Sequence, residues 1–382
     1  MPLWEHLTGQ PEATEALTAA ASTDPGNASM THSWLITGPP GSGRSNLAYA
    51  FAAALLSRGP HDEEATLRQV AARSHPDLAV LSTERIIITI DEVRTLVAAS
   101  QFSPSVGRYR VVVIEDADRM TERTSNLLLK ALEEPPPRTV WLLCAPSEAD
   151  LLPTIRSRVR SVRLRMPAIG DVATLLESRD GVDPDTAVIA AREAQSHIGM
   201  ARRLALDPSA RVRRRQTLET ALGIRSVSDA VIAAATLLGV AGDDAKAITE
   251  ERDADERASA LRSLGVEPGG TVPPALRSQL RALEDDQKRR ATRSLRDGID
   301  RIMVDLLSLY RDVLLLQLGV DEQPINDAIR AQLDAVAAAS TPAATLAVLD
   351  AVAVARRRIE SNVSPAMALE AMLVVVSRHA TR

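Results

Sequence analysis

The chain has 382 residues, of which 45% are hydrophobic and 25% are charged, with a formal net charge of −5. This length allows two or three domains, and the weakly acidic balance gives no overall attraction to nucleic acid. The single cysteine, Cys144, excludes a disulfide scaffold and a cysteine zinc site, and no stretch approaches the ~20 apolar residues of a membrane span. Since the N-terminus also shows no secretory signal, we expect a cytoplasmic protein without membrane attachment.

The first part of the sequence alternates apolar runs with amphipathic stretches. Helices are predicted after Gln10, from Asn46 to Leu56 and from Ser125 to the prolines that begin at Pro135. Buried strands are predicted at 33–37, 78–81, 110–114 and 139–145, and a further β-branched run at 86–90 leads into a helix. Strands that alternate with helices predict an α/β fold with a parallel, doubly wound sheet and a ligand at the carboxyl ends of its strands.

After Pro167 the strand pattern disappears. Residues 168–204 are predicted to form a small helical unit, and everything from residue 208 onward is predicted to be helical. Apolar residues from Leu295 to Leu316 recur every three or four positions, which indicates a heptad-like seam on one long helix, packed within the chain or between subunits. We therefore predict three domains, at 1–165, 166–207 and 208–382, with an unusually charged segment at about 241–292 that holds a loop at Pro268–Gly270.

A glycine-rich loop follows the first strand. Gly38, Gly43 and Ser45 fit the phosphate-loop pattern G-x-x-x-x-G-K-[ST], in which backbone N–H groups and a helix N-terminus surround a phosphate. Arg44 stands where this pattern has lysine, and a planar guanidinium does not replace a compact ammonium. We therefore expect weak or absent hydrolysis, and ATP with Mg²⁺ could still be held without turnover. The candidate nucleotide-binding residues of the loop are Gly38, Pro39, Pro40, Gly41, Ser42, Gly43, Arg44 and Ser45.

Further motifs follow in a fixed order. Gly9-Gln10 precedes the loop, an apolar strand ends in Glu115-Asp116, the block N-L-L-L-K-A-L-E-E-P-P occupies 126–136, and Ser157-Arg158 comes last. Together these features resemble the bacterial clamp-loader family of AAA+ proteins, strongly over residues 1–207 and weakly beyond. The resemblance implies an α/β P-loop AAA+ core, a helical lid and an all-α collar. In this family the collar assembles a five-subunit ring, which opens the sliding clamp and places it on primed DNA during replication.

The resemblance also implies roles for single residues. Glu115 and Asp116 stand at the Walker B position in the reverse of the usual order, so the carboxylates that would hold Mg²⁺ and polarise water are both displaced. Any Mg²⁺ that enters with nucleotide would lie near Ser45 and Glu115. Arg158, beside Ser157, matches an arginine finger that completes the ATP site of the neighbouring subunit.

Two further features bear on the resemblance. Arg202 matches a lid arginine that senses nucleotide, and a solvated helix charge is an equal alternative. The family's four-cysteine zinc module is missing from the sequence, so zinc is not expected.

We favour a non-motor subunit of the DNA polymerase III clamp loader, with no polymerase site of its own. Its partners would be the tau/gamma ATPase, the delta subunit, the sliding clamp and, indirectly, primed DNA, in a hetero-oligomer. One alternative is an ATP-hydrolysing subunit of the tau/gamma type. Another is a P-loop phosphotransferase, which Arg44 and the lack of an acceptor-site motif disfavour. The arginine-rich run 211–215 is expected to be a solvated helix face rather than a DNA contact.

Overall fold

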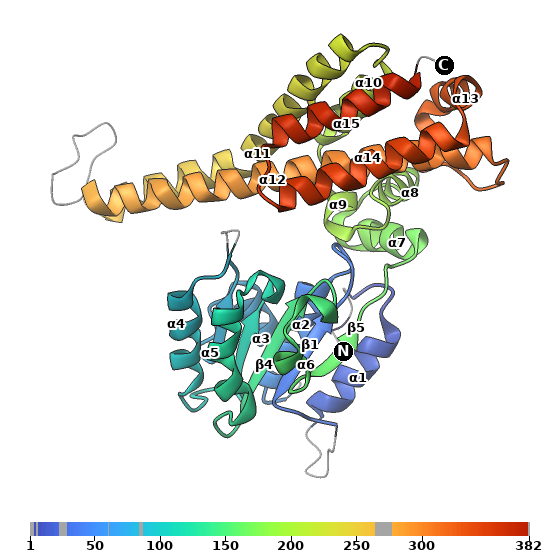
Figure 1. Cartoon of the computed structure of the whole chain (residues 1–382). Helices are drawn as coiled ribbons and strands as arrows, with labels where there is room; N and C mark the ends of the chain where they lie inside the picture. The colour runs from blue at the N-terminus through green and yellow to red at the C-terminus, as the bar shows by residue number, and fades with distance from the viewer. Residues whose placement is uncertain are drawn as a thin grey trace. The chain divides into compact units, whose positions relative to one another are not determined.

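The computed structural model describes residue 4 and residues 7–22, 29–59, 61–83, 87–263 and 277–380. The chain divides into two compact units, Met1–Leu206 and Asp207–Arg382. The first unit is built on a sheet covered by helices, and the second is helical throughout its described residues (Figure 1).

The sheet of the first unit has five parallel strands in the order β2-β3-β4-β1-β5. All seven residues of β4 are buried, and so are all residues of β1 and all of β3 except Arg110. Strands buried on both faces consist almost entirely of apolar residues, so the sequence predicted these three strands. The edge strand β5 was not predicted, because among its four residues only Val162 is buried. The strands are β1 (Ser33–Thr37), β2 (Leu78–Leu81), β3 (Arg110–Ile114), β4 (Thr139–Ala145) and β5 (Arg160–Arg163).

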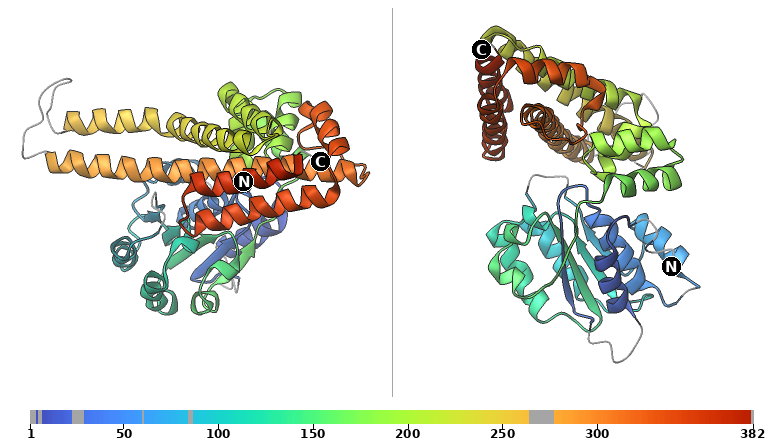
Figure 2. Two further views of the ribbon diagram at one scale, coloured as in Figure 1. Left: turned by 45° about the horizontal axis from the view of Figure 1, so that its top comes forward. Right: turned by 90° about the vertical axis from the view of Figure 1, so that its right-hand side faces the viewer.

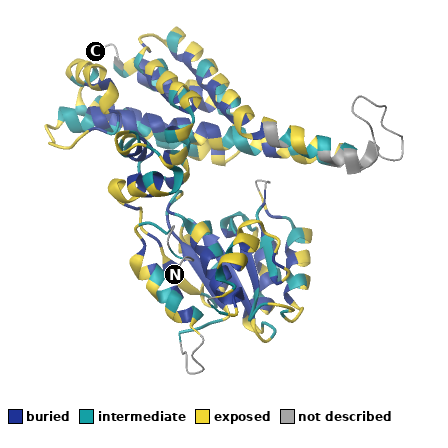
Figure 3. Cartoon of the chain, turned by 180° about the vertical axis from the view of Figure 1, so that it is seen from behind, coloured by how far each residue is buried: buried dark blue, intermediate teal, exposed yellow. Residues whose placement is uncertain are grey.

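Helices cover both faces of this sheet (Figure 2). Successive strand residues point to opposite faces, so Trp34 and Ile36 of β1 join one core and Leu35 joins the other. The first core includes α1 (Pro11–Ala21), α2 (Arg44–Leu56) and α3 (Glu63–Ala71), and the second includes α4 (Ile90–Ser100), α5 (Glu122–Glu133) and α6 (Pro153–Arg156). The expected α/β fold with a parallel sheet is confirmed, and its strands form the dark buried centre in Figure 3.

The β-branched run before α4 is not a strand. Within it, Ile88 makes only an isolated bridge to Met120, and Ile86 lies outside the described residues. The backbone N–H of Thr89 donates to the carboxylate of Glu92 at 2.7 Å, and the Thr89 hydroxyl caps the backbone N–H of Glu92 in return. This capping box starts the helix at Ile90 and so ends the extended run.

Three helices complete the first unit, namely α7 (Ile169–Asp180), α8 (Pro184–Glu193) and α9 (Ile198–Leu206). The side chain of Gln10 fastens the segment before α7 to the start of the chain. Its Nε2 donates to the carbonyl of Arg165 at 2.7 Å, and the backbone N–H of Arg165 donates back to Oε1 at 3.0 Å. These helices lie in the same compact unit as the sheet, so a separate lid domain with a boundary at residue 165 stays a prediction.

The second unit is formed by six helices in its described residues. The predicted seam lies on α12 and is used inside the chain, where Ile302, Leu306 and Leu309 are buried in one core shared with α11, α14 and α15. The helices are α10 (Pro208–Leu222), α11 (Val227–Ser263), α12 (Arg277–Gln317), α13 (Arg330–Ala339), α14 (Pro342–Glu360) and α15 (Pro365–Ala380).

The charged segment 241–292 belongs to the antiparallel pair of α11 and α12, which lie side by side (Figure 2). Arg257 pairs with Glu284, and Arg290 contacts both Asp253 and Glu256, so part of its charge is neutralised across the pair. The loop predicted at Pro268–Gly270 lies outside the described residues.

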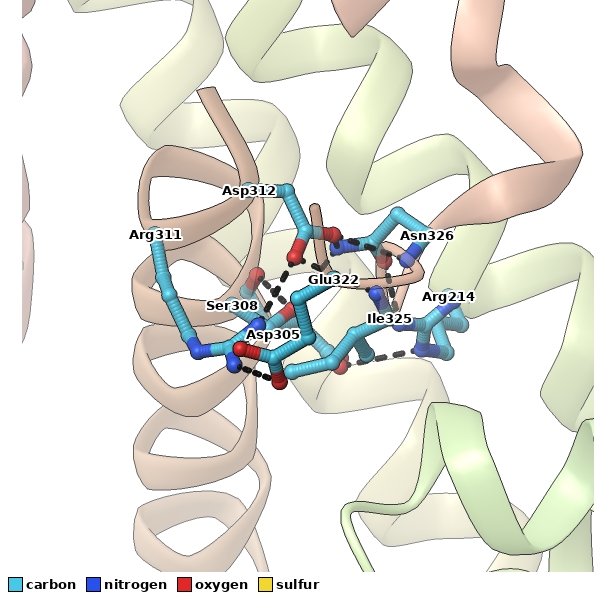
Figure 4. Close-up of polar contacts among 8 residues, drawn as sticks. All are labelled: Arg214, Asp305, Ser308, Arg311, Asp312, Glu322, Ile325 and Asn326. Carbon is cyan, nitrogen blue, oxygen red and sulfur yellow. Dashed lines mark hydrogen bonds and ion pairs between the residues drawn. The ribbon is translucent and has the colours of Figure 1, made fainter. Parts of the chain in front are cut away.

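A buried polar cluster joins α10, α12 and the segment before α13 (Figure 4). Arg214 donates from Nε to Asp305 at 3.1 Å and from Nη2 to Asn326 at 2.5 Å. The carboxylate of Asp312 accepts three N–H bonds from Ile325 and Asn326, at 2.8 to 3.1 Å. The prediction of a solvated face for residues 211–215 is therefore wrong at Arg214, which is 8% exposed and shares the buried face of α10 with Ala210.

Among the described helices, none alone is long and apolar enough to cross a membrane. One pair, Asp327–Ala339 with Pro342–Glu360, passes that test jointly by length and composition, but it is bent by 113°.

Candidate functional site

The glycine-rich loop connects β1 to α2 as the sequence predicted. Gly41 and Gly43 have φ values of +81° and +94°, in the left-handed region that favours glycine, and α2 begins directly after Gly43. The hydroxyl of Ser42 is buried, and the described residues offer it no hydrogen-bond partner. A loop of this kind at a helix N-terminus suits a phosphate group.

The first residues of α9 close on this loop. A Cβ built on Gly41 would lie 2.2 Å from Cγ of His197, so the imidazole rests directly against the loop and only glycine fits there. The backbone N–H of Ile198 donates to the carbonyl of Gly41 at 3.2 Å, and Met200 N–H donates to Nδ1 of His197 at 3.2 Å. His197 was missed by the sequence analysis because a single histidine before a helix matches no motif.

Arg44 is turned onto the loop itself. Its Nη1 donates to the carbonyl of Gly38 at 2.7 Å. Burial raises the pKa of Asp118 and raises the pKa of Cys144 to about 12, while the positive charge of Arg44 opposes both shifts. The guanidinium of Arg44 thus lies near enough to Cys144 of β4 to affect its pKa, but it is hydrogen-bonded to the carbonyl of Gly38.

Glu115, at the end of β3, is held by three side chains. Tyr49 donates a short hydrogen bond to its Oε1, Arg73 donates to the same oxygen at 2.7 Å, and Ser82 donates to Oε2 at 3.1 Å. Burial raises the pKa of Tyr49, and the hydrogen bond to Glu115 adds to this shift, so the phenol stays a proton donor. The neighbouring Asp116 has Nε of Arg119 at 3.8 Å. Both oxygens of Glu115 are therefore engaged within the chain.

The site fits a phosphate better than it fits a hydrolytic centre. The glycines, the helix N-terminus and the unpartnered Ser42 hydroxyl suit a phosphate. Both oxygens of Glu115 accept hydrogen bonds from other side chains, so this carboxylate is not presented to a metal ion that would enter with the phosphate.

Arg158 follows the short helix α6 and is held against its own chain. Its Nε donates to Glu133 at 2.6 Å, and Nη2 pairs with the same carboxylate oxygen. Its Nη1 donates to the carbonyl of Thr154 at 2.7 Å and to the hydroxyl of Ser157 at 3.0 Å. The side chain keeps 32% of its surface exposed. None of these partners belongs to the glycine loop, so the role of Arg158 as a finger stays a prediction.

Arg202, the candidate lid arginine, is bound to Asp180 at the end of α7. Its Nε donates to Oδ1 at 2.9 Å, and Arg179 donates to Oδ2 of the same carboxylate at 2.6 Å. Burial of Asp180 works to raise its pKa, but the hydrogen bonds from the two arginines outweigh it, and the pKa is lowered. The side chain of Arg202 is 55% exposed, on the same helix whose first residue contacts Gly41.

Comparison with known proteins gives matches to subunits of DNA polymerase III. Residues 9–168 match the family described as DNA polymerase III, delta subunit. The DNA polymerase III subunit delta' of Pseudomonas aeruginosa is 38% identical over 157 residues, which cover 39% of this chain and 47% of that protein. Subunit delta' of Escherichia coli is 31% identical over 198 residues, which cover 50% of this chain and 59% of that protein. The chain thus spans about half the length of the curated relatives it matches.

Three further likenesses are more distant. The gamma/tau subunit of Mycobacterium tuberculosis is 28% identical over 192 residues, 48% of this chain and 32% of that protein. Among solved structures, a DNA polymerase III gamma subunit-related protein from Thermotoga maritima aligns over 91% of this chain and 94% of its own, with 18% identity and a TM-score of 0.39. A RuvB protein of the same organism covers 68% of this chain and 83% of its own, also with a TM-score of 0.39 and 18% identity.

Proposed function

We propose that the chain is a non-motor subunit of the clamp loader. The premise is that residues 9–168 match the family of the DNA polymerase III delta subunit and that 157 residues of the chain are 38% identical to a subunit delta'. In this role it occupies one place in a hetero-oligomeric ring with tau/gamma ATPase and delta subunits. The ring loads the sliding clamp onto primed DNA. The chain itself turns over little or no ATP.

One observation carries this proposal, namely the engagement of Glu115 at the Walker B position. Tyr49, Arg73 and Ser82 occupy both of its carboxylate oxygens, so it is not free to hold a metal ion or polarise a water. Hydrolysis depends on placing such a group within about 1 Å, and a displacement of that size costs ~100-fold in rate. Arg44, bonded to the carbonyl of Gly38, further weakens the site because it does not supply the compact ammonium of the phosphate-loop lysine.

Arg158 supplies the second part of the proposed function. A guanidinium provided by a neighbouring subunit stabilises charge on the transferring phosphoryl group and is worth ~10³–10⁵ in rate. Arg158 is partly exposed and is held by Glu133 in a defined position at the end of the sheet domain. To act in trans it exchanges the Glu133 contact for a phosphate oxygen of the adjacent site. For Arg202 we propose a structural role. It links α9, whose first residue contacts the glycine loop, to Asp180 at the end of α7.

The experiment is a titration of the purified full-length chain with ATP and Mg²⁺, followed by single-turnover hydrolysis. We expect hydrolysis no faster than that of a Ser45→Ala variant, whether or not nucleotide binds. Turnover at the rate of a motor subunit, abolished by Ser45→Ala, would favour the tau/gamma-type alternative instead. Failure of the chain to co-purify with ring partners, together with transfer of phosphate to a small acceptor, would favour the phosphotransferase.

A further inference from the structure

The helical unit contains a cavity of about 300 Å³ that is unrelated to the glycine loop. It is lined by the end of α10 and by residues of α12, α13, α14 and α15, and most of these are alanine, valine, leucine or isoleucine. Sites for small organic molecules have this character, with mostly apolar walls and a few placed polar groups. The chemistry of an occupant is therefore decided by the polar residues.

Two of the polar lining residues are already satisfied. The hydroxyl of Ser340 accepts from Nε2 of Gln317 at 2.8 Å, and the hydroxyl of Thr345 donates to Oε1 of Gln317 at 3.0 Å. One glutamine side chain thus serves both of them. Neither of these residues calls for a ligand.

Tyr310 differs from them. It is only 6% exposed and it lines the cavity. Its hydroxyl is not among the enclosed atoms that lack a partner, so we take it to be open to the cavity, where it can donate to an occupant or to water. Burial raises the pKa of Tyr310, which keeps the hydroxyl protonated and able to donate.

Arg225 brings one positive charge to the cavity. Arg225 lines it, and its Nη1 is anchored on the carbonyls of Leu222 at 2.6 Å and Ile224 at 2.9 Å, at the end of α10. Its guanidinium forms no ion pair with a carboxylate among the described residues, although Asp229 lies near enough to feel its charge. His379 also lines the cavity, and none of the described lining residues is acidic.

We propose that this cavity binds a small organic acid, whose apolar body fills the aliphatic walls and whose carboxylate accepts from Tyr310 beside Arg225. A metal cation is excluded because the described walls carry no carboxylate. A nucleotide is a poor fit, because one arginine in an apolar cavity does not compensate several phosphate charges. This binding site is independent of the proposed role in the clamp loader.

The test is a titration of the full-length protein with phenylacetate and with isovalerate, followed by ligand-observed NMR, with neutral phenylacetamide as the matched probe. We expect saturable one-to-one binding of an acid, about tenfold or more tighter than the amide, since a charged hydrogen bond is at stake. Tyr310→Phe, which removes only the hydroxyl, should weaken binding of the acid about tenfold. Arg225→Gln should remove the preference for acid over amide.

Arg215→Gln, which replaces an exposed arginine of α10, is the matched control and should bind both probes as the wild type does. The proposal is overturned if neither acid saturates at millimolar concentration, or if the amide binds as tightly as the acid. It is equally overturned if Arg215→Gln has the same effect as Arg225→Gln, because the preference would then reflect overall charge. Circular dichroism of each variant confirms that the helices are retained.

Discussion

At the residue scale, Arg44 and Glu115 impair different parts of a hydrolytic site. Arg44 is bonded to the backbone of the loop, and Glu115 is held by Tyr49 and Arg73. Replacing Arg44 by lysine does not free the carboxylate of Glu115 from its partners. We therefore predict that Arg44→Lys alone leaves single-turnover ATP hydrolysis at background, since the displaced carboxylate still costs ~100-fold. The matched control is Arg58→Lys, at an exposed position. Rapid hydrolysis by Arg44→Lys would show that Glu115 is available after all.

Cys144 gives a second prediction at this scale. It is fully buried in β4, and burial raises its thiol pKa to about 12. The thiolate is the reactive form, so a thiol reagent should label the native chain very slowly and the unfolded chain rapidly at about pH 8. The folded state binds the thiol proton more tightly than the unfolded state does. The contribution of this proton to the free energy of unfolding is therefore complete below the unfolded pKa of about 8.5. It is lost as the pH rises from there toward the folded pKa of about 12. Fast labelling of native protein would contradict the burial.

At the element scale, the sequence predicted the strands that are buried on both faces. β1, β3 and β4 are continuous apolar runs because helices cover both faces of the sheet. The seam on α12 was predictable because its apolar residues are buried in the core of the helical unit. The edge strand β5 has arginine or serine at its exposed positions, so its sequence shows no continuous apolar run. The residues at 86–90 have strand propensity, but the capping box at Thr89 starts helix α4 at Ile90 and so ends the extended segment.

The candidate site was predictable only where residues follow one another in a motif. The loop, Glu115-Asp116 and Ser157-Arg158 were found by order and spacing. Their partners were not, because Tyr49 is 66 positions from Glu115 and Glu133 is 25 positions from Arg158, and neither forms a local pattern with its partner. Arg214 was assigned to a solvent face because the fixed position of Asn326, 112 positions away, is not visible in the sequence.

The cluster around Asp312 gives the prediction for this scale. Its fully buried carboxylate satisfies three N–H groups of the segment that connects α12 to α13. Asp312→Ala should lower the free energy of opening of this region by about 2–5 kcal/mol, because buried donors lose a charged acceptor. Hydrogen exchange of peptides from α12 and α13 measures this.

The matched control for Asp312→Ala is Asp334→Ala, which breaks the exposed pair with Arg330. An exposed pair of this kind contributes about 0–1 kcal/mol. Equal effects of the two substitutions would contradict the structural role of the cluster.

At the scale of the whole molecule, the two compact units suggest separate tasks. We predict that deletion of residues 207–382 leaves a folded first unit that no longer enters the clamp-loader ring, because the long helices and their apolar core are removed. Protection of Cys144 from thiol reagents reports that the remaining unit is folded. Entry of the truncated chain into the ring with unchanged affinity would assign assembly to the first unit.

The central claim is that the chain serves a neighbour's ATP site rather than its own. Its most direct test is clamp- and DNA-stimulated ATPase of rings reconstituted with Arg158→Ala, with assembly checked by sizing. The control is Arg156→Ala, an exposed arginine two positions away. The Arg158 pair with Glu133 is exposed, so its loss should change stability by at most about 1 kcal/mol. We predict that well-formed Arg158→Ala rings lose part of their ATPase, because one site loses ~10³–10⁵ in rate, while Arg156→Ala rings keep theirs. Full activity in well-formed Arg158→Ala rings would contradict the account.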